Sequence, residues 1–217
     1  MRAWSLLLVA LLGLALPTTA LPLPVATHSE SFETGWGPWA ADHQVQCEDD
    51  GTCTLDWSLE RFQGVARSGT WSLENHINGI LDDGVVWAEA PLLATPGTPV
   101  PVSITFHVLS EVHSDVNNWG VVAYLGEEDP EREDDFTVVG QTDQGAGWRT
   151  FCHAAVVTPD ADGKVWAAFG ISVTWETPRT YYLDDVAVGI GEASADCAEG
   201  PLCLWVDLPV CGVGEDP

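Results

Sequence analysis

The chain has 217 residues, of which 33 are acidic and 7 basic, giving a formal net charge of −26 at pH 7. So acidic a surface repels polyanions, which excludes nucleic acid and anionic membranes as partners. Two explanations for the acidity are open: life in high salt, where self-repulsion is screened, or calcium-rich extracellular surroundings. We favour the first, because the acidic residues are spread along the chain.

The first 20 residues are predicted to be a secretory signal peptide. A basic start, Met1-Arg2, precedes an apolar run from Leu6 to Leu16, and small residues follow up to Ala20. The run is short for a bilayer span, and no second long apolar run follows. We therefore expect a secreted, extracellular protein with no membrane span. Residues 21–28 are a proline-bearing lead-in.

Strand signals dominate the rest of the chain, and no long stretch has helical periodicity. Pro101 to Leu109 alternates, with Val102, Ile104 and Phe106 on one face. Many short strands separated by turns favour an antiparallel sandwich or barrel. The predicted strands cover residues 30–33, 54–59, 69–74, 84–89, 101–109, 119–125, 135–140, 148–157, 164–175 and 180–190.

The six cysteines all follow the predicted signal peptide, which is typical of an oxidising compartment. Cys47 and Cys53 bracket a turn-like loop, so a local disulfide is expected there, and three bridges could form in all. Cysteines also mark the acidic segment 191–217, which we interpret as an appended tail. No C-x-x-C pair is present, so a zinc site is not indicated.

The closing strand places two adjacent carboxylates, Asp184 and Asp185, inside an apolar run. Asp184 has the parity of Val186, Val188 and Ile190, so it points to the core if those residues do. A buried carboxylate needs a cation or several hydrogen bonds. A metal ion and a hydrogen-bonded, partly exposed Asp184 therefore both remain open.

Three motifs occur in a fixed order: SFETGW at residues 31–36, ARSGTWSL at 66–73 and YYLDDVAV at 181–188. This order resembles the galactose-binding-like β-jelly-roll superfamily, above all its carbohydrate-binding modules, with MAM-type adhesion domains as near relatives. The resemblance implies an all-β, antiparallel β-sandwich of jelly-roll type over residues 29–190. The cysteines depart from the MAM pattern.

The resemblance also implies a structural calcium ion, Ca2+, where the first and last strands meet. Carried over, its ligands are the side chains of Glu33 and Asp184 and the backbone around Ser68 and Gly69. Calcium suits a shell of carboxylate and carbonyl oxygens.

No G-x-S-x-G, H-E-x-x-H or phosphate-cradling loop is present in the sequence. A glycosidase needs only two suitably spaced carboxylates, but most acids here fit a solvated surface more simply. We therefore expect a non-catalytic module that binds extracellular carbohydrate, with two alternatives. One is an adhesion or surface-structural protein that binds another protein, and the other is a small carbohydrate-active enzyme.

Three residues are candidates for ligand contact. Trp166 shares parity with Ala168, Gly170 and Ser172, so a large ring stands beside small residues on the non-core face. Trp119 lies at a predicted strand edge and His107 on the non-core face of its strand. For the tryptophans the alternative is core packing, and for His107 it is a solvated strand face.

Overall fold

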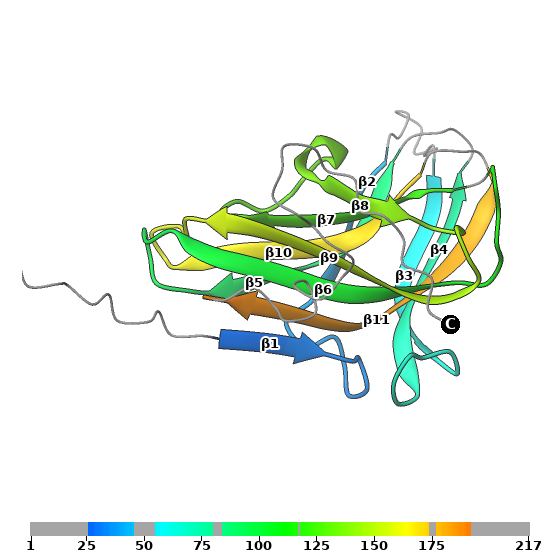
Figure 1. Ribbon diagram of the computed structural model, residues 1–217, viewed down its shortest axis with the longest axis horizontal. Helices are drawn as coiled ribbons and strands as arrows, with labels where there is room; N and C mark the ends of the chain where they lie inside the picture. Colours follow the sequence, from blue (N-terminus) through cyan, green and yellow to red (C-terminus); the bar gives the residue numbers. More distant parts are fainter. Residues whose placement is uncertain (1–25, 46–54, 80–83, 117, 174–176, 192–217) are drawn as a thin grey trace, which may run out of the picture.

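The computed structural model describes residues 26–45, 55–79, 84–116, 118–173 and 177–191. Strands form two antiparallel sheets that pack face to face (Figure 1). The described part contains one short 3-10 helix, η1 (Glu133–Asp135), and no α-helix. The predicted all-β, antiparallel sandwich is therefore confirmed. Within these residues, no helix has the length and apolar character needed to cross a membrane.

Each sheet is built from strands that are distant in sequence. The first sheet has the order β3 (Leu55–Gln63), β4 (Trp71–Gly79), β11 (Pro178–Ile190), β6 (Val100–Ser110) and β9 (Gly147–Val157), and β1 (Ala26–Glu30) also pairs with β11. The second sheet has the order β2 (Ala40–Gln44), β5 (Val85–Leu93), β10 (Lys164–Ser172), β7 (Gly120–Gly126) and β8 (Thr137–Gln141).

Alternating apolar residues of the two sheets meet in one core. The predicted inward face of β6 is confirmed, because Ile104 and Phe106 are fully buried in the main cluster. Phe106 packs against Phe169 of β10 with ring centroids 4.9 Å apart, and Phe169 packs edge-on against Trp39 at 5.0 Å. Burial of this apolar surface is the main term that stabilises the sandwich.

Strand β11 changes its neighbour halfway along its length. Its first half pairs with β4 up to Leu183, and its second half, from Val186 onward, pairs with β1 on the same side. At the junction the pairing with β6 shifts register between Asp184 and Ala187, and Asp185 adopts a φ of +50°. The extra residue of this bulge reverses the alternation of side chains.

The bulge corrects the predicted orientation of Asp184. Leu183 packs in the core before the bulge and Val186 after it, so Asp184 does not point to the core with Val186. It points to the outer side of the first sheet, where it is nonetheless 0 % exposed.

Two further boundaries differ from those predicted. β1 begins at Ala26, inside the predicted lead-in, and residues 31–36 form turns rather than a strand. β2, with the polar sequence AADHQ, was not predicted, because its central residues lack apolar alternation. The predicted signal peptide, most of the tail and five of the six cysteines lie outside the described residues.

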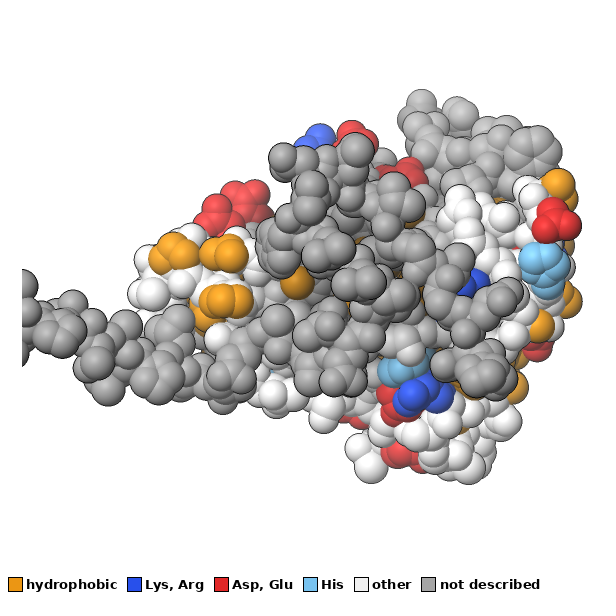
Figure 2. Space-filling model, in the orientation of Figure 1, with side chains coloured by type: hydrophobic (Ala, Val, Ile, Leu, Met, Phe, Trp, Pro, Cys, Tyr) orange, Lys and Arg blue, Asp and Glu red, His pale blue; other side chains and the backbone are white. Residues whose placement is uncertain are grey.

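Acidic side chains dominate the charged surface of the sandwich. On the face in Figure 2, acidic side chains lie at several separate places and basic ones are few.

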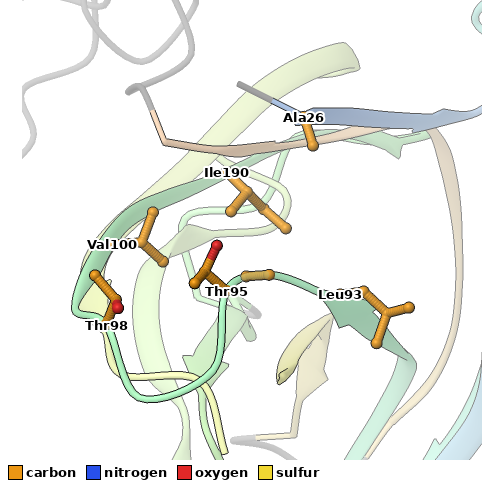
Figure 3. Close-up of a pocket in the computed structure, with 7 residues that line it drawn as sticks. Ala26, Leu93, Thr95, Thr98, Val100 and Ile190 are labelled. Carbon is orange, nitrogen blue, oxygen red and sulfur yellow. The ribbon is translucent and has the colours of Figure 1, made fainter. Parts of the chain in front are cut away.

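At the end where β1 starts and β11 stops, an apolar pocket of about 200 Å³ opens between Ala26, Val100 and Ile190 (Figure 3). Thr95 and Thr98 are the polar side chains at its rim.

Candidate functional site

The β3–β4 loop is held at both ends by carboxylates from distant parts of the chain. Asp184 Oδ2 accepts hydrogen bonds from the backbone N–H groups of Arg67 (2.7 Å) and Ser68 (3.2 Å). Glu33 Oε1 accepts from the N–H groups of Thr70 (2.9 Å) and Trp71 (2.8 Å). The three motifs therefore meet at one corner, which we call the carboxylate corner (residues 33, 67–71 and 184–185).

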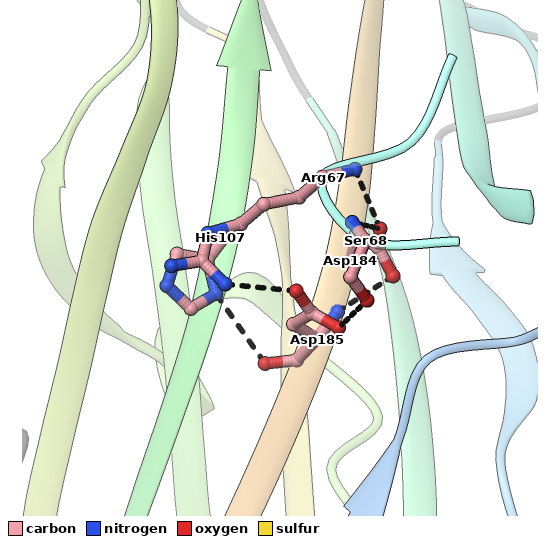
Figure 4. A network of polar contacts seen from close by, with 5 residues as sticks. All are labelled: Arg67, Ser68, His107, Asp184 and Asp185. Atoms are coloured by element: carbon pink, nitrogen blue, oxygen red, sulfur yellow. Dashed lines mark hydrogen bonds and ion pairs between the residues drawn. The ribbon is translucent and has the colours of Figure 1, made fainter. Parts of the chain in front are cut away.

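Asp184 is a buried anion with several hydrogen bonds. Its Oδ1 accepts a third backbone bond from Asp185 N at 2.7 Å (Figure 4). Burial raises the pKa of the Asp184 carboxyl, and the N–H groups of Ser68, Arg67 and Asp185 oppose that rise. Asp184 is therefore hydrogen-bonded, as one of the two interpretations required, although it is buried rather than partly exposed.

Asp185 holds the outer side of the same loop. Its carboxylate bonds the Arg67 guanidinium (2.8 Å) and the Ser68 hydroxyl (2.6 Å) (Figure 4). His107 Nδ1 lies 3.4 Å from the Asp185 carbonyl oxygen. His107 is only 9 % exposed, so it is not the solvated side chain of the alternative prediction. Burial, and then the charge of Arg67, lower the pKa of this imidazole, which lies beside the carboxylate corner.

Gly69 is required where Glu33 meets the loop. Its φ is +66°, and a Cβ there would lie 2.4 Å from the Glu33 carboxyl carbon. The N–H groups of Trp71 and Thr70 lower the pKa of Glu33, which keeps it ionised. Arg61 holds the backbone around Glu33 in place, because its guanidinium donates to the carbonyl oxygens of Phe32 (2.8 Å) and Glu33 (3.0 Å).

The donor set at the corner suits a hard cation. Glu33 and Asp184 supply carboxylate oxygens from the two sides of one loop, as the resemblance implies. The bonds above leave acceptor positions on Glu33 Oε2 and Asp184 Oδ1, since a carboxylate oxygen can accept two. A cluster of three or more His, Cys, Asp or Glu side chains arranged for a metal is absent from the described residues, so further ligands would be carbonyls or water.

A second candidate site lies on the outer face of the second sheet, formed by β5, β10 and β7. Trp166 is there, as predicted, since Val165 and Ala167 on either side of it face the core. It is half-buried, and its cross-strand neighbours are Pro91 and Gly126. Two residues further along β10, Ala168 pairs with Glu89, so Trp166 and Glu89 are diagonal neighbours on one face.

Glu89 has an unusual environment for a carboxyl group. It is 8 % exposed, and Trp87 Nε1 donates a hydrogen bond to it. Burial raises the pKa of Glu89 to about 7, and the charges of Asp129 and Asp42 add to the rise. The pKa of Asp129 is also raised, chiefly by burial and then by Glu131. The prediction missed Glu89, although an acid between Trp87 and Pro91 in an apolar strand is the same signal that singled out Asp184.

A small apolar cluster covers part of this outer face. Val85, Trp87, Val122 and Ala168 form a small outer cluster, and Phe136, which follows η1, packs on it with its ring 5.0 Å from that of Trp87. Trp166 is not a member of this cluster or of the main core. Its ring therefore lies beside the covered part of the face.

Trp119 is not on an open edge. It is 0 % exposed, and its ring meets Tyr181 edge-on at 5.8 Å inside the core. Its backbone N–H donates to Thr142 Oγ1 at 3.0 Å. The alternative prediction of core packing is therefore the correct one for Trp119, because a side chain without exposed surface cannot stack on a ligand. The structure thus keeps Trp166 apart from both His107 and Trp119.

Comparisons with known proteins give structural matches only. No family model and no curated protein matches the chain. Among solved structures, the CBM22-1 xylan-binding domain from Paenibacillus barcinonensis Xyn10C has a TM-score of 0.49 and 14 % identity, covering 81 % of this chain and 100 % of that domain. The K1 cleaved adhesin domain of Lys-gingipain from Porphyromonas gingivalis has a TM-score of 0.46 and 16 % identity, with 75 % and 97 % covered. Likenesses of this size say nothing about the ligand of this chain.

Proposed function

We propose that the protein is a secreted, non-catalytic module that binds extracellular carbohydrate on the outer face of its second sheet. The observation that carries the proposal is the half-buried ring of Trp166 diagonal to the carboxyl group of Glu89. An aromatic ring offers an apolar face to the C–H groups of a sugar, and carboxyl oxygens accept bonds from its hydroxyls. Trp166 is the large ring on this face that belongs to neither apolar cluster.

Two carboxyl groups of this face, Glu89 and Asp129, lie close together. Glu89 and Asp129 are joined by a side-chain hydrogen bond. Glycosidases hold their two carboxyl groups about 5 to 9.5 Å apart, so that a sugar or a water fits between them. A hydrogen-bonded pair is closer than that, so Glu89 and Asp129 do not have the spacing of a glycosidase pair.

A glycan array, with xylan and other plant and microbial polysaccharides among its probes, tests the proposal. Trp166→Ala should weaken binding of any captured glycan about ten-fold, in line with the loss of one aromatic contact. Phe62→Ala is the matched control, since Phe62 pairs with Tyr182 on the outer side of the first sheet. No captured glycan, or equal losses in both variants, would contradict the proposal. Capture of a surface protein instead would favour the adhesion alternative.

We also propose that Ca2+ binds at the carboxylate corner, with Glu33, Asp184 and carbonyls near Ser68 and Gly69 as ligands. The support is the family resemblance together with the unused acceptor positions on both carboxylates. Calcium should raise the thermal midpoint above that in a chelator, and magnesium at equal ionic strength should not. Glu33→Gln should abolish the calcium effect and Glu60→Gln should keep it. Equal thermal midpoints of the wild-type protein in calcium and in chelator would refute the proposed calcium site.

A further inference from the structure

Small side chains line the outer face of the first sheet where β11, β6 and β9 run side by side. Ser103 and Thr105 of β6 point outward, because the residues that alternate with them, such as Ile104, belong to the core. Ser103 lies opposite a glycine of β11 and an alanine of β9, and Thr105 lies opposite an alanine and a cysteine. We call this set the outer stripe; it consists of Ser103, Thr105, Cys152, Ala154, Ala187 and Gly189.

The centre of the outer stripe is shielded from solvent. Ser103 is 0 % exposed and Thr105 is 2 % exposed. Their cross-strand neighbours do not account for this burial, because glycine, alanine and cysteine side chains stand no taller on the sheet than the side chains they would have to cover. On either side the same face is open, since Thr150 of β9 and Ser29 of β1 are exposed. A narrow band over β6 is therefore covered by a further layer.

Within the described part of the chain, no strand supplies that layer. The strands in extensive contact with β6 are β11 and β9, beside it in the sheet, and β7 in the facing sheet. The β3–β4 loop meets the outer face at Asp184, which pairs with His107, beyond the end of the outer stripe. The cover therefore comes from another segment of the chain or from a second molecule.

The internal segments outside the described ranges are badly placed to form the cover. Residues 46–54, 80–83 and 174–176 connect strands at the end of the sheet where β11 begins. Pro178, at that end, is about 30 Å along β11 from Ala187, at about 3.3 Å per residue. The longest of these segments, 46–54, is anchored on both sides and so extends at most about 15 Å from its anchors.

The segment that follows β11 starts beside the outer stripe. The backbone N–H of Gly191 donates to the carbonyl oxygen of Pro101 at 2.8 Å, and Pro101 is two positions before Ser103 on β6. Residues 192–217 continue from this point, and adjacent strands are only about 4.8 Å apart, so a few residues suffice to cross the stripe. Residues 21–25 start further away, because β1 is separated from β6 by β11.

We propose that residues 192–217 fold back across the outer stripe and cover Ser103 and Thr105. The stripe carries no charged side chain, so an acidic segment meets no like charge on it. Residues 202–206, with the sequence LCLWV, are the apolar part of this segment and would bury their side chains against the small residues of the stripe. The segment then occupies the outer face of the first sheet, independently of any carbohydrate bound to the second sheet.

NMR of the full secreted chain tests the proposed cover. Nuclear Overhauser effects from the γ-methyl group of Thr105 should reach protons of residues 192–217, and those from the exposed Thr150 should not. Mixtures of labelled and unlabelled protein distinguish contacts within one chain from contacts with a second copy. Contacts of Thr105 with residues 21–25 or with a second copy, or none beyond its own sheet, would overturn the proposal.

Hydrogen exchange in two matched variants gives a second readout. Thr105→Arg places a long charged side chain beneath the cover, so amides of residues 192–217 should exchange about ten-fold faster than in the wild type. Thr150→Arg, on the open part of the same face, should leave their exchange unchanged. If Thr105→Arg also accelerates exchange in β6, the sheet itself is disturbed, and the Overhauser effects of the wild type decide. Wild-type exchange of residues 192–217 in Thr105→Arg with β6 intact overturns the proposal.

Discussion

The Oδ2 atom of Asp184 lies 2.7 Å from the backbone nitrogen of Arg67, although 117 residues separate the two. The bond joins the closing strand to the β3–β4 loop at the point where β11 passes from pairing with β4 to pairing with β1. A carboxylate that accepts backbone N–H bonds fixes a loop more firmly than a surface ion pair does. The carboxylate corner therefore stabilises the junction of three distant segments.

The adjacent carboxylates Asp184 and Asp185 should contribute unequally to the free energy of unfolding. Asp184→Asn replaces an oxygen that accepts from buried N–H groups, and we expect the free energy of unfolding to fall by about 3 kcal/mol. Asp185→Asn loses a partly exposed ion pair, with 43 % of the Arg67 side chain exposed, and should cost less than about 1 kcal/mol. Urea denaturation of both variants measures the difference. Equal losses would contradict the role assigned to Asp184.

Gly69 should be far less replaceable than another glycine of similar conformation. Gly97 has a φ of +65°, and a Cβ there would meet no atom within 4 Å. Gly97→Ala should cost about 1 kcal/mol for the left-handed backbone alone. Gly69→Ala also displaces the Glu33 carboxylate from the N–H groups of Thr70 and Trp71, so it should be more destabilising than Gly97→Ala. Similar denaturation midpoints for the two variants would show that Glu33 can move without loss.

Much of the fold could be predicted, because strands with one apolar face carry a period of two in their sequence. The inward face of β6, with Ile104 and Phe106, is the clearest case. β2 escaped prediction because its pairing with β5, rather than its own composition, makes it a strand. The contact between the motifs around Glu33 and Asp184 could be anticipated only from the resemblance, since spacing carries no information on contacts between distant residues.

The candidate site was predicted in part, and the errors have physical causes. The shared parity of Asp184 and Val186 predicted that Asp184 faces the core. Asp184 is buried, but a bulge between the two residues reverses the alternation, so it lies on the other side of the sheet. Parity correctly placed Trp166 outside the core, whereas Trp119 lies just before β7, where strand periodicity does not determine the face.

The free energy of unfolding should depend on pH through Glu89. Its pKa is about 7 in the folded protein, against an ordinary value of 4.5 that applies to the unfolded chain. The protonated form of Glu89 therefore favours the folded state. The stabilisation is complete below pH 4.5 and is lost as the pH rises to about 7. Glu89→Gln mimics the protonated carboxyl group, so this variant should gain stability relative to the wild type between those values.

Denaturation of both proteins at several pH values measures that gain. Other groups contribute to the pH profile of each protein, so the difference between the two profiles is the relevant quantity. Parallel profiles for the wild type and Glu89→Gln would rule out a proton on Glu89 near neutral pH.

Salt should stabilise the protein strongly. With 33 acidic and 7 basic residues, the folded chain holds like charges closer together than the unfolded chain does. Screening shortens the range of their repulsion from about 10 Å at 0.1 M salt to about 3 Å at 1 M. The thermal midpoint should therefore rise steeply with sodium chloride and level off near 1 M. Sorbitol at matched osmolality separates screening from general exclusion of solutes. A midpoint that is flat in sodium chloride, or that rises equally in sorbitol, would show that repulsion between carboxylates does not limit the stability of this fold.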